Sequence, residues 1–481
     1  GSRRSCPPGA EIRWQGLRYG GLLTAEAHWR RAGKIHSGRA RAVRQTDFTS
    51  GSIAKSLLAF TVPLMIGNIL QQCYNITDTL IVGRFLGKEP LAAVGSAYTL
   101  MVFLTSVLTG LSMGSGAFLS IALGKKDSDE LKTGNFMAFS IIALFTAVVL
   151  AAVYILINPL LLVLQTPSEV FLPLKSYLLV IFSGIPAVFL YNYYASSLRA
   201  VGNSSAALIF LAVSAILNTV LDILFVAFFG WGIKGAAAAT VISQYVSAAG
   251  LLFYAMKNAP VLRFDKKHMR FERSFLRPIF SLAFLTSLQQ SIMNFGILMV
   301  QGRVNSFGTE VMAAFAAAVK IDTLAYSPAQ DFGNAFSTFV AQNHGAKKYG
   351  RIKSGIKTSA AAVAVFCLIV SAAVFIFAGR LTAFFTGDEN VIRIGTQYLR
   401  TEGVFYCLIG FLFLFYGYFR AVQKPAVSVV LTVASLGTRV LLAYTLSAVP
   451  AIGVKGIWLS IPIGWAFADV LGIFLLKREK R

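Results

Sequence analysis

The chain has 481 residues, of which 56% are hydrophobic and only 13% are charged. Charged residues make up about a quarter of a typical soluble protein, so this composition argues against a soluble protein. The net charge of +24 does not indicate nucleic-acid binding, because Lys and Arg separate long apolar runs and form no single basic domain. The four cysteines have no disulfide or zinc spacing, and the four histidines lie outside the apolar runs. We therefore expect no enzyme, no cofactor and no His or Cys metal site within the membrane.

The first 50 residues differ from the rest of the chain. They are rich in Arg and have no apolar core long enough for a secretory signal. The leading Gly1-Ser2 is typical of a cloning remnant. We expect residues 1–50 to be a disordered or cloning-derived extension, with a membrane-surface segment as the alternative.

Twelve apolar segments follow. A membrane-spanning helix needs roughly 20 apolar residues, and these runs lack the alternation of barrel strands. The predicted spans are 53–83, 91–122, 133–158, 172–198, 204–229, 235–256, 278–306, 310–341, 355–378, 392–419, 425–449 and 454–476. The predicted fold is an all-α polytopic membrane protein with twelve transmembrane helices.

Basic residues concentrate in alternate connections between these spans, at 125–132, 257–273, 347–353 and 477–481. Cytoplasmic loops of membrane proteins carry an excess of Lys and Arg. These connections are therefore predicted to be cytoplasmic. An even number of spans then places both termini in the cytoplasm of a cell-membrane protein.

Segments of the first half return 221 residues later in the second half. The matched segments are 198–201 with 419–422, 232–235 with 453–456, 89–93 with 310–314, Tyr177 with Tyr398, and Gly124, Lys132 and Gly134 with Gly345, Lys353 and Gly355. One such match is weak, but five at a constant spacing indicate an internal duplication.

The duplication divides the chain into two six-helix lobes. Residues 51–256 form the predicted N-lobe, 257–277 a basic cytoplasmic linker, and 278–481 the C-lobe. An even number of helices per repeat gives both lobes the same orientation, so a pseudo-two-fold axis along the membrane normal should relate them. Two such lobes can rock about a central cavity, which favours transport over anchoring or signalling.

Polar side chains in the first span form one helical stripe. Asn68, Gln71, Asn75 and Asp78 are spaced by three, four and three residues. Ionisable groups at membrane depth are costly and are functional candidates by default. Hydrogen bonding between helices is the alternative; we favour it for Asn68 but not for Asp78. Gln71 and Asn75 are candidates for a substrate cavity.

A second polar group lies on the fifth and sixth spans. Asn218 and Asp222 are four residues apart, on one helix face, and Thr240 follows on the next span. Two buried carboxylates in one lobe must share a cation, or one must bind a proton, because burial and mutual repulsion oppose a double charge. Oxygen ligands suit a hard cation such as Na⁺, and they also suit a proton relay. Asp78, Asn218, Asp222 and Thr240 are thus the predicted cation-coupling residues, and the ion remains open.

The second lobe does not repeat this group. The repeat places Arg439 at the position of Asn218 and Ala443 at that of Asp222. We therefore expect the coupling site in the first lobe only. The cavity candidates of the second lobe are Gln289, Gln290, Met293, Asn294, Asp322 and Tyr326. An ion pair between Asp322 and Lys320 is the alternative for that carboxylate, and Glu402 is interpreted as snorkelling at a span end.

These motifs resemble the multidrug and toxic compound extrusion (MATE) family, in particular its DinF-like bacterial branch. The resemblance covers roughly residues 50–477. It rests on Pro63, Asn75-Ile-Thr-Asp78-Thr79, Leu198-Arg-Ala-Val-Gly-Asn203, Asn218-Thr-Val-Leu-Asp222, Gly235-Ala-Ala-Ala-Ala-Thr240 and Ala341-Gln-Asn-His-Gly-Ala-Lys347. It implies two six-helix lobes and a first-lobe cation site at Asp78, Asn218, Asp222 and Thr240. Members of the NorM type also use acidic residues in the seventh and tenth helices, where this chain has Gln289, Gln290, Phe405 and Tyr406.

The resemblance implies a monomeric secondary transporter that exports small organic, often cationic, compounds in exchange for Na⁺ or H⁺. A lipid-linked precursor flippase of the wider superfamily is the alternative. Such a flippase is expected to carry extra cationic residues in its cavity, whereas the cavity candidates here are mostly acidic or neutral. A membrane-embedded enzyme would need a nucleophile–base or metal group at membrane depth, which the positions of the histidines argue against.

Overall fold

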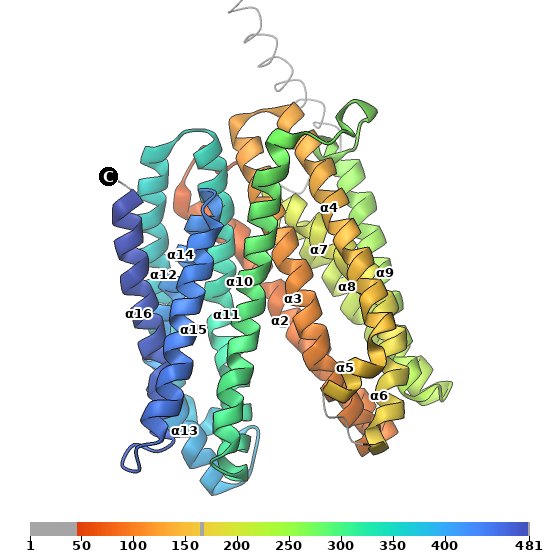
Figure 1. Ribbon diagram of the computed structural model, residues 1–481, viewed down its shortest axis with the longest axis vertical. Coiled ribbons are helices and arrows are strands. Elements are labelled where there is room, and N and C mark those ends of the chain that lie inside the picture. The colour runs from red at the N-terminus through yellow and green to blue at the C-terminus, as the bar shows by residue number, and fades with distance from the viewer. Residues whose placement is uncertain (1–45, 164–167, 480–481) are drawn as a thin grey trace, which may run out of the picture. The chain divides into compact units, whose positions relative to one another are not determined.

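The computed structural model describes residues 46–163 and 168–479, and all regular structure in these residues is helical (Figure 1). The first half contains α2 (Ile53–Leu86), α3 (Lys88–Lys125), α4 (Ser128–Ile155), α5 (Ile157–Val163), α6 (Ser168–Ile181), α7 (Ile185–Ala200), α8 (Ser205–Asp222) and α9 (Gly232–Asn258). The second half contains α10 (Arg273–Asn305), α11 (Thr309–Gly345), α12 (Tyr349–Ala383), α13 (Glu389–Gly403), α14 (Tyr406–Ala421), α15 (Pro425–Ser447) and α16 (Lys455–Glu479). Short 3₁₀ or π segments, η1 (Phe182–Gly184), η2 (Ile223–Phe228), η3 (Pro260–Leu262) and η4 (Lys266–His268), connect some of them. Residues 1–45, most of the predicted extension, lie outside the described residues.

Each of the twelve predicted spans coincides with a helix or a pair of helices. Among the described residues, ten helical segments are long and apolar enough to cross a membrane, and α13 with α14, bent by 52°, adds an eleventh. The remaining span is α11, a 37-residue helix that carries Lys320, Asp322 and Asp331 and buries most of its side chains against other helices. The all-α membrane fold is therefore confirmed, although the predicted tenth span is two helices rather than one.

The duplication is visible in the backbone. Of the ten described residues with a positive φ angle, eight form four pairs whose members are 221 residues apart. The pairs are Gly87 with Gly308, Lys126 with Lys347, Gly202 with Gln423, and Gly232 with Gly453. A positive φ is uncommon in residues other than glycine, so the recurrence at Lys126, Lys347 and Gln423 means that both halves turn at the same points. The two halves are structural repeats with the same chain direction.

Buried apolar side chains form two clusters. One draws on residues between Ile81 and Ala283, and the other mainly on residues between Val300 and Ala468. The second cluster also takes in Phe48, Leu57 and Phe60 from the beginning of the chain. Helix α2 therefore starts in the C-lobe core and continues along α8 of the N-lobe.

The two lobes meet closely at the end of the helices where the α9–α10 linker lies. A Cβ atom on Gly124 of α3 would lie 2.0 Å from the backbone oxygen of Gln342 on α11. The repeat-related contact has the same geometry, since a Cβ on Gly345 would lie 2.0 Å from the oxygen of Ile121. We call this symmetric pair the linker-end contact. It lies on the pseudo-two-fold axis, because each half of it is the image of the other.

The segment before α2 is held against the C-lobe. Phe48 is fully buried, with its amide bonded to the side-chain oxygen of Gln342 at 3.2 Å and its carbonyl accepting from Asn343 at 3.0 Å. Arg351 donates to the carbonyls of Phe48, Ser50 and Gly51 at 2.6–2.9 Å. Residues 46–50 were predicted to belong to the extension, and that boundary is wrong because distant residues of α11 and α12 fix their position.

The linker is shorter than predicted, since α9 ends at Asn258 and α10 begins at Arg273. It packs on α4: Asn135 donates to the carbonyl of Leu262 at 2.8 Å, and Lys132 pairs with Asp265. The hydrogen bond from Lys132 holds the pKa of Asp265 below its usual value. The linker is thus a docked part of the N-lobe.

Candidate functional site

The predicted coupling residues lie together between α2, α8 and α9. Asp222 is 0% exposed, Asn218 and Thr240 are buried, and Asp78 of α2 is partly buried beside Asp222. The amide of Asn218 donates to the hydroxyl of Thr240 at 3.3 Å. Two tyrosines, Tyr74 and Tyr177, border the two carboxyl groups. The stripe on α2 therefore faces the N-lobe at Asp78.

This group is short of hydrogen-bond donors. One oxygen of Asp78, the amide oxygen of Asn218 and both carboxyl oxygens of Asp222 are buried with no hydrogen-bond partner. Burying polar oxygens without partners is costly, and burying a charge without a counter-ion costs more. A proton, or a monovalent cation held by carboxyl, amide and hydroxyl oxygens, would relieve this cost. The described residues contain no cluster of three or more His, Cys, Asp or Glu side chains able to hold a metal ion.

The backbone changes form at this site. Helix α8 ends at Asp222, and residues 223–228 continue as the π-helical segment η2. Extra residues in a helical turn are rare and often occur at functional sites, because they redirect the side chains next to them. Asp222 is the last residue before this change, so the coupling site and the irregular backbone coincide.

The C-lobe has a different charged group, near the position that the repeat relates to Asn218. Asp322 of α11 accepts a hydrogen bond from Tyr406, and Glu402 and Arg439 lie near it. Glu402 is only 3% exposed, so the interpretation that it snorkels at a span end is wrong. Lys320 is exposed and forms no ion pair with Asp322. Arg439 stands where the N-lobe has Asn218, so a guanidinium lies near these acids, although its Nε has no hydrogen-bond partner among the described residues.

The predicted cavity residues differ in how far their side chains are buried. Gln71 is exposed, while Asn75, Gln290, Met293, Asn294 and Tyr326 are partly buried. Gln289 is buried on α10, where its amide lies 3.7 Å from the sulfur of Met293. These side chains come from α2, α10 and α11, the helices that bring the two lobes together.

Near the lobe interface lie three charged residues, Asp331, Arg199 and Arg420, which were not identified as a group from the sequence. Asn68 of α2 donates to both oxygens of Asp331 on α11, at 2.7 and 2.6 Å. Arg199 and Arg420, which are repeat equivalents, lie close to each other, and Arg199 is also near Asp331. The cleft beside Asn68 has a volume of only about 10 Å³, room for about one water. Asn68 was predicted to bond between helices; here that bond joins the two lobes.

Comparisons with known proteins agree with this architecture. The family model MatE matches residues 63–224 and 283–445, one match in each lobe. The chain is 31% identical to "Probable multidrug resistance protein YpnP" of Bacillus subtilis, over 90% of this chain and 97% of that protein. It is 25% identical to "Multidrug export protein MepA" of Staphylococcus aureus, over 89% of this chain and 95% of that protein. A solved structure described as the outward-facing conformation of a multidrug resistance MATE transporter has the same fold, with a TM-score of 0.85 at 22% identity, covering 92% of this chain and 98% of the other.

Proposed function

Because the chain belongs to the MatE family of membrane transporters, we propose that it exports small organic cations in exchange for Na⁺ or H⁺. The prediction that the chain is a transporter and not an enzyme is confirmed by this membership. The observation that supports coupling is the group of four partnerless oxygens on Asp78, Asn218 and Asp222. A positively charged occupant would satisfy these oxygens, and no basic side chain of the described residues pairs with them.

Helix α2 is the element that transmits occupancy to the lobes. One part of it contributes Asp78 to the N-lobe site, and another bonds to Asp331 of the C-lobe through Asn68. A cation between Asp78 and Asp222 pulls α2 toward α8, whereas the Asn68–Asp331 bond pulls it toward α11. The ion and the substrate then favour different lobe arrangements, and coupling follows from their different affinities for the two states.

The linker-end contact is the closed gate of one such arrangement. We propose that the linker end faces the cytoplasm, in line with its basic loops, and that each lobe moves as a unit on either side of the linker. Gln71, Asn75 and Gln290, with their neighbours on α10 and α11, line the path of a substrate in a monomeric protein. The relatives named for drug resistance and drug export support organic compounds as the substrate class.

A lipid-linked precursor flippase is the second candidate function. It is favoured by Arg199 and Arg420, two cations near the lobe interface that could bind a phosphate-bearing substrate. Proteoliposomes separate the two functions. Gradient-driven efflux of a fluorescent organic cation supports the exporter; scrambling of an isoprenyl pyrophosphate lipid without cation efflux supports the flippase.

A further inference from the structure

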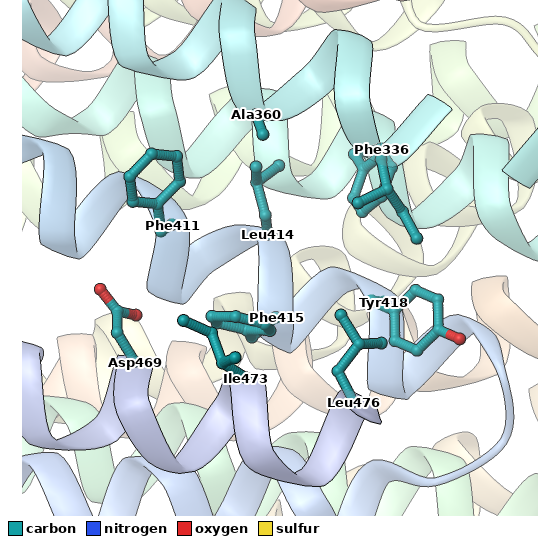
Figure 2. A pocket seen from close by; sticks show the side chains of 10 residues that line it. Phe336, Ala360, Phe411, Leu414, Phe415, Tyr418, Asp469, Ile473 and Leu476 are labelled. Atoms are coloured by element: carbon teal, nitrogen blue, oxygen red, sulfur yellow. The ribbon is translucent and has the colours of Figure 1, made fainter. Parts of the chain in front are cut away.

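The C-lobe contains an apolar pocket far in sequence from the coupling residues. It has a volume of about 250 Å³ and lies between α11, α12, α14 and α16 (Figure 2). Phe336, Ala360, Phe411 and Phe415 form part of its wall. This volume is slightly below the roughly 300 Å³ at which typical ligand pockets begin, so it suits a single aromatic ring with a short chain.

One wall residue is acidic. Asp469 of α16 is 6% exposed, and both of its carboxyl oxygens are buried without a hydrogen-bond partner. Figure 2 shows the carboxyl group extending from α16 into the gap toward α14, among apolar side chains. No Lys, Arg or His lines the pocket. A carboxyl group in such surroundings is costly unless something pairs with it.

The equivalent place in the N-lobe is filled and neutral. Ala360 corresponds to Phe139, whose ring lies 5.3 Å from that of Tyr193 and 5.4 Å from that of Phe264 in the linker. Asp469 corresponds to Ala248, which is fully buried. The same helix arrangement thus folds with an aromatic ring in place of Ala360 and with a methyl group in place of the Asp469 carboxylate. The small side chain and the carboxylate belong to the second repeat alone, so packing of the repeat fold does not require them.

The pocket lies beside a surface that faces the hydrocarbon of the bilayer. Next to Asp469 on α16, Val470 is 67% exposed and Phe474 is 60% exposed. Ile473, which lines the pocket, is also exposed. A ligand that reaches the pocket from this side must partition into lipid.

We propose that this pocket binds a lipophilic monovalent amine that enters from the bilayer. The ammonium group pairs with Asp469, and an aryl or short alkyl body fills the space left by Ala360. Aromatic faces add cation–π attraction in a desolvated site. A neutral molecule leaves the carboxyl group unpaired, and an anion is repelled by it. The site is separate from the coupling residues and does not depend on the proposed ion exchange.

The test uses the full-length protein in lipid nanodiscs with tritiated 4-phenylbutylamine as the probe. The neutral isostere 4-phenylbutan-1-ol is the competitor, so the charge requirement is measured on the wild-type protein. We expect the alcohol to compete about tenfold more weakly or worse, which corresponds to losing one charge-assisted contact. Equal competition, or no binding of the amine by the wild-type protein, would overturn the proposal.

Two variants locate the site. Asp469→Asn removes the charge at nearly constant shape and should weaken amine binding about tenfold. Ala360→Phe places in the pocket the ring that fills the N-lobe and should abolish binding. Asp129→Asn, at an exposed position outside both sites, is the matched control and should leave binding unchanged. Loss of binding in Asp78→Asn with retention in Asp469→Asn would place the amine at the coupling site and overturn the proposal, whatever the outcome for ion exchange.

Photolabelling provides a readout that does not depend on variants. A diazirine derivative of 4-phenylbutylamine should label peptides of α14 and α16 in the wild-type protein, and excess unlabelled amine should prevent the labelling. Labelling confined to α2, α8 or α9 would contradict the assignment.

Discussion

Replacing Gly124 by alanine is expected to open the linker-end contact. The new Cβ atom would lie 2.0 Å from the oxygen of Gln342, where real Cβ atoms essentially never come closer than 3.0 Å to other atoms. The clashing atom belongs to the backbone of α11, so no side-chain rotation can relieve it. Helices α3 and α11 must therefore separate by about 1 Å at this point.

The cost of this separation follows from the contacts that meet there. Overpacking of a tight interface costs about 1–3 kcal/mol. The side chain of Gln342 bonds to the amide of Phe48 at 3.2 Å and to the carbonyl of Ala200 at 2.9 Å, and losing these bonds adds about 1 kcal/mol each. The closed arrangement should lose at least about 2 kcal/mol, which raises the open population roughly 30-fold.

Cysteine accessibility measures this shift. In a variant whose four native cysteines are replaced by alanine, Ser120→Cys is the reporter, because Ser120 is buried one helical turn from Gly124. Gly124→Ala should increase its reaction rate with a charged methanethiosulfonate by about tenfold or more. Gly95→Ala is the control, since a Cβ there meets nothing within 4 Å. Equal rates in both variants would refute the role given to the linker-end contact.

Two other substitutions test the contacts that surround α2. Phe48→Ala should lower the thermal unfolding midpoint clearly, because removing a fully buried phenylalanine costs about 3–5 kcal/mol. Phe384→Ala, at an 86% exposed position, should change it little, and similar shifts in the two variants would contradict the packing described for Phe48. Asn68→Leu should destabilise the protein because it leaves the buried carboxyl of Asp331 without its donor. Adding Asp331→Leu should restore part of that stability; a double variant that loses as much stability as the two single variants together, or more, would argue against a direct Asn68–Asp331 bond.

Much of the fold could be predicted because two patterns are visible in the sequence itself. Apolar runs mark the helices, and the constant spacing of 221 residues marks the repeat. The helix ends were less predictable, since helices such as α3 and α11 extend past their apolar runs into polar residues. The position of Phe48 is fixed by hydrogen bonds with Gln342 and Arg351, about 300 residues away in the sequence. No local sequence pattern predicts these contacts.

The coupling residues were predictable because their polar side chains stand out on apolar helices. What could not be predicted is how charges from different helices combine. The sequence places Glu402 near a span end, whereas in the structure it is buried beside Asp322, just before the bend between α13 and α14. Asp469 is an isolated carboxylate within the apolar part of α16, with no polar stripe to draw attention to it, and its significance depends on the space left by Ala360.

The most direct test of ion-coupled export is efflux from proteoliposomes. A fluorescent organic cation is loaded inside, and Na⁺ or H⁺ gradients are imposed on wild-type protein, Asp78→Asn, Asp222→Asn and the control Asp129→Asn, whose side chain is exposed. We expect one of the two gradients to drive efflux in the wild type and the control, and neither to drive it in the Asp78 or Asp222 variant. Undiminished gradient-driven efflux in both of those variants would contradict the assignment of the coupling site.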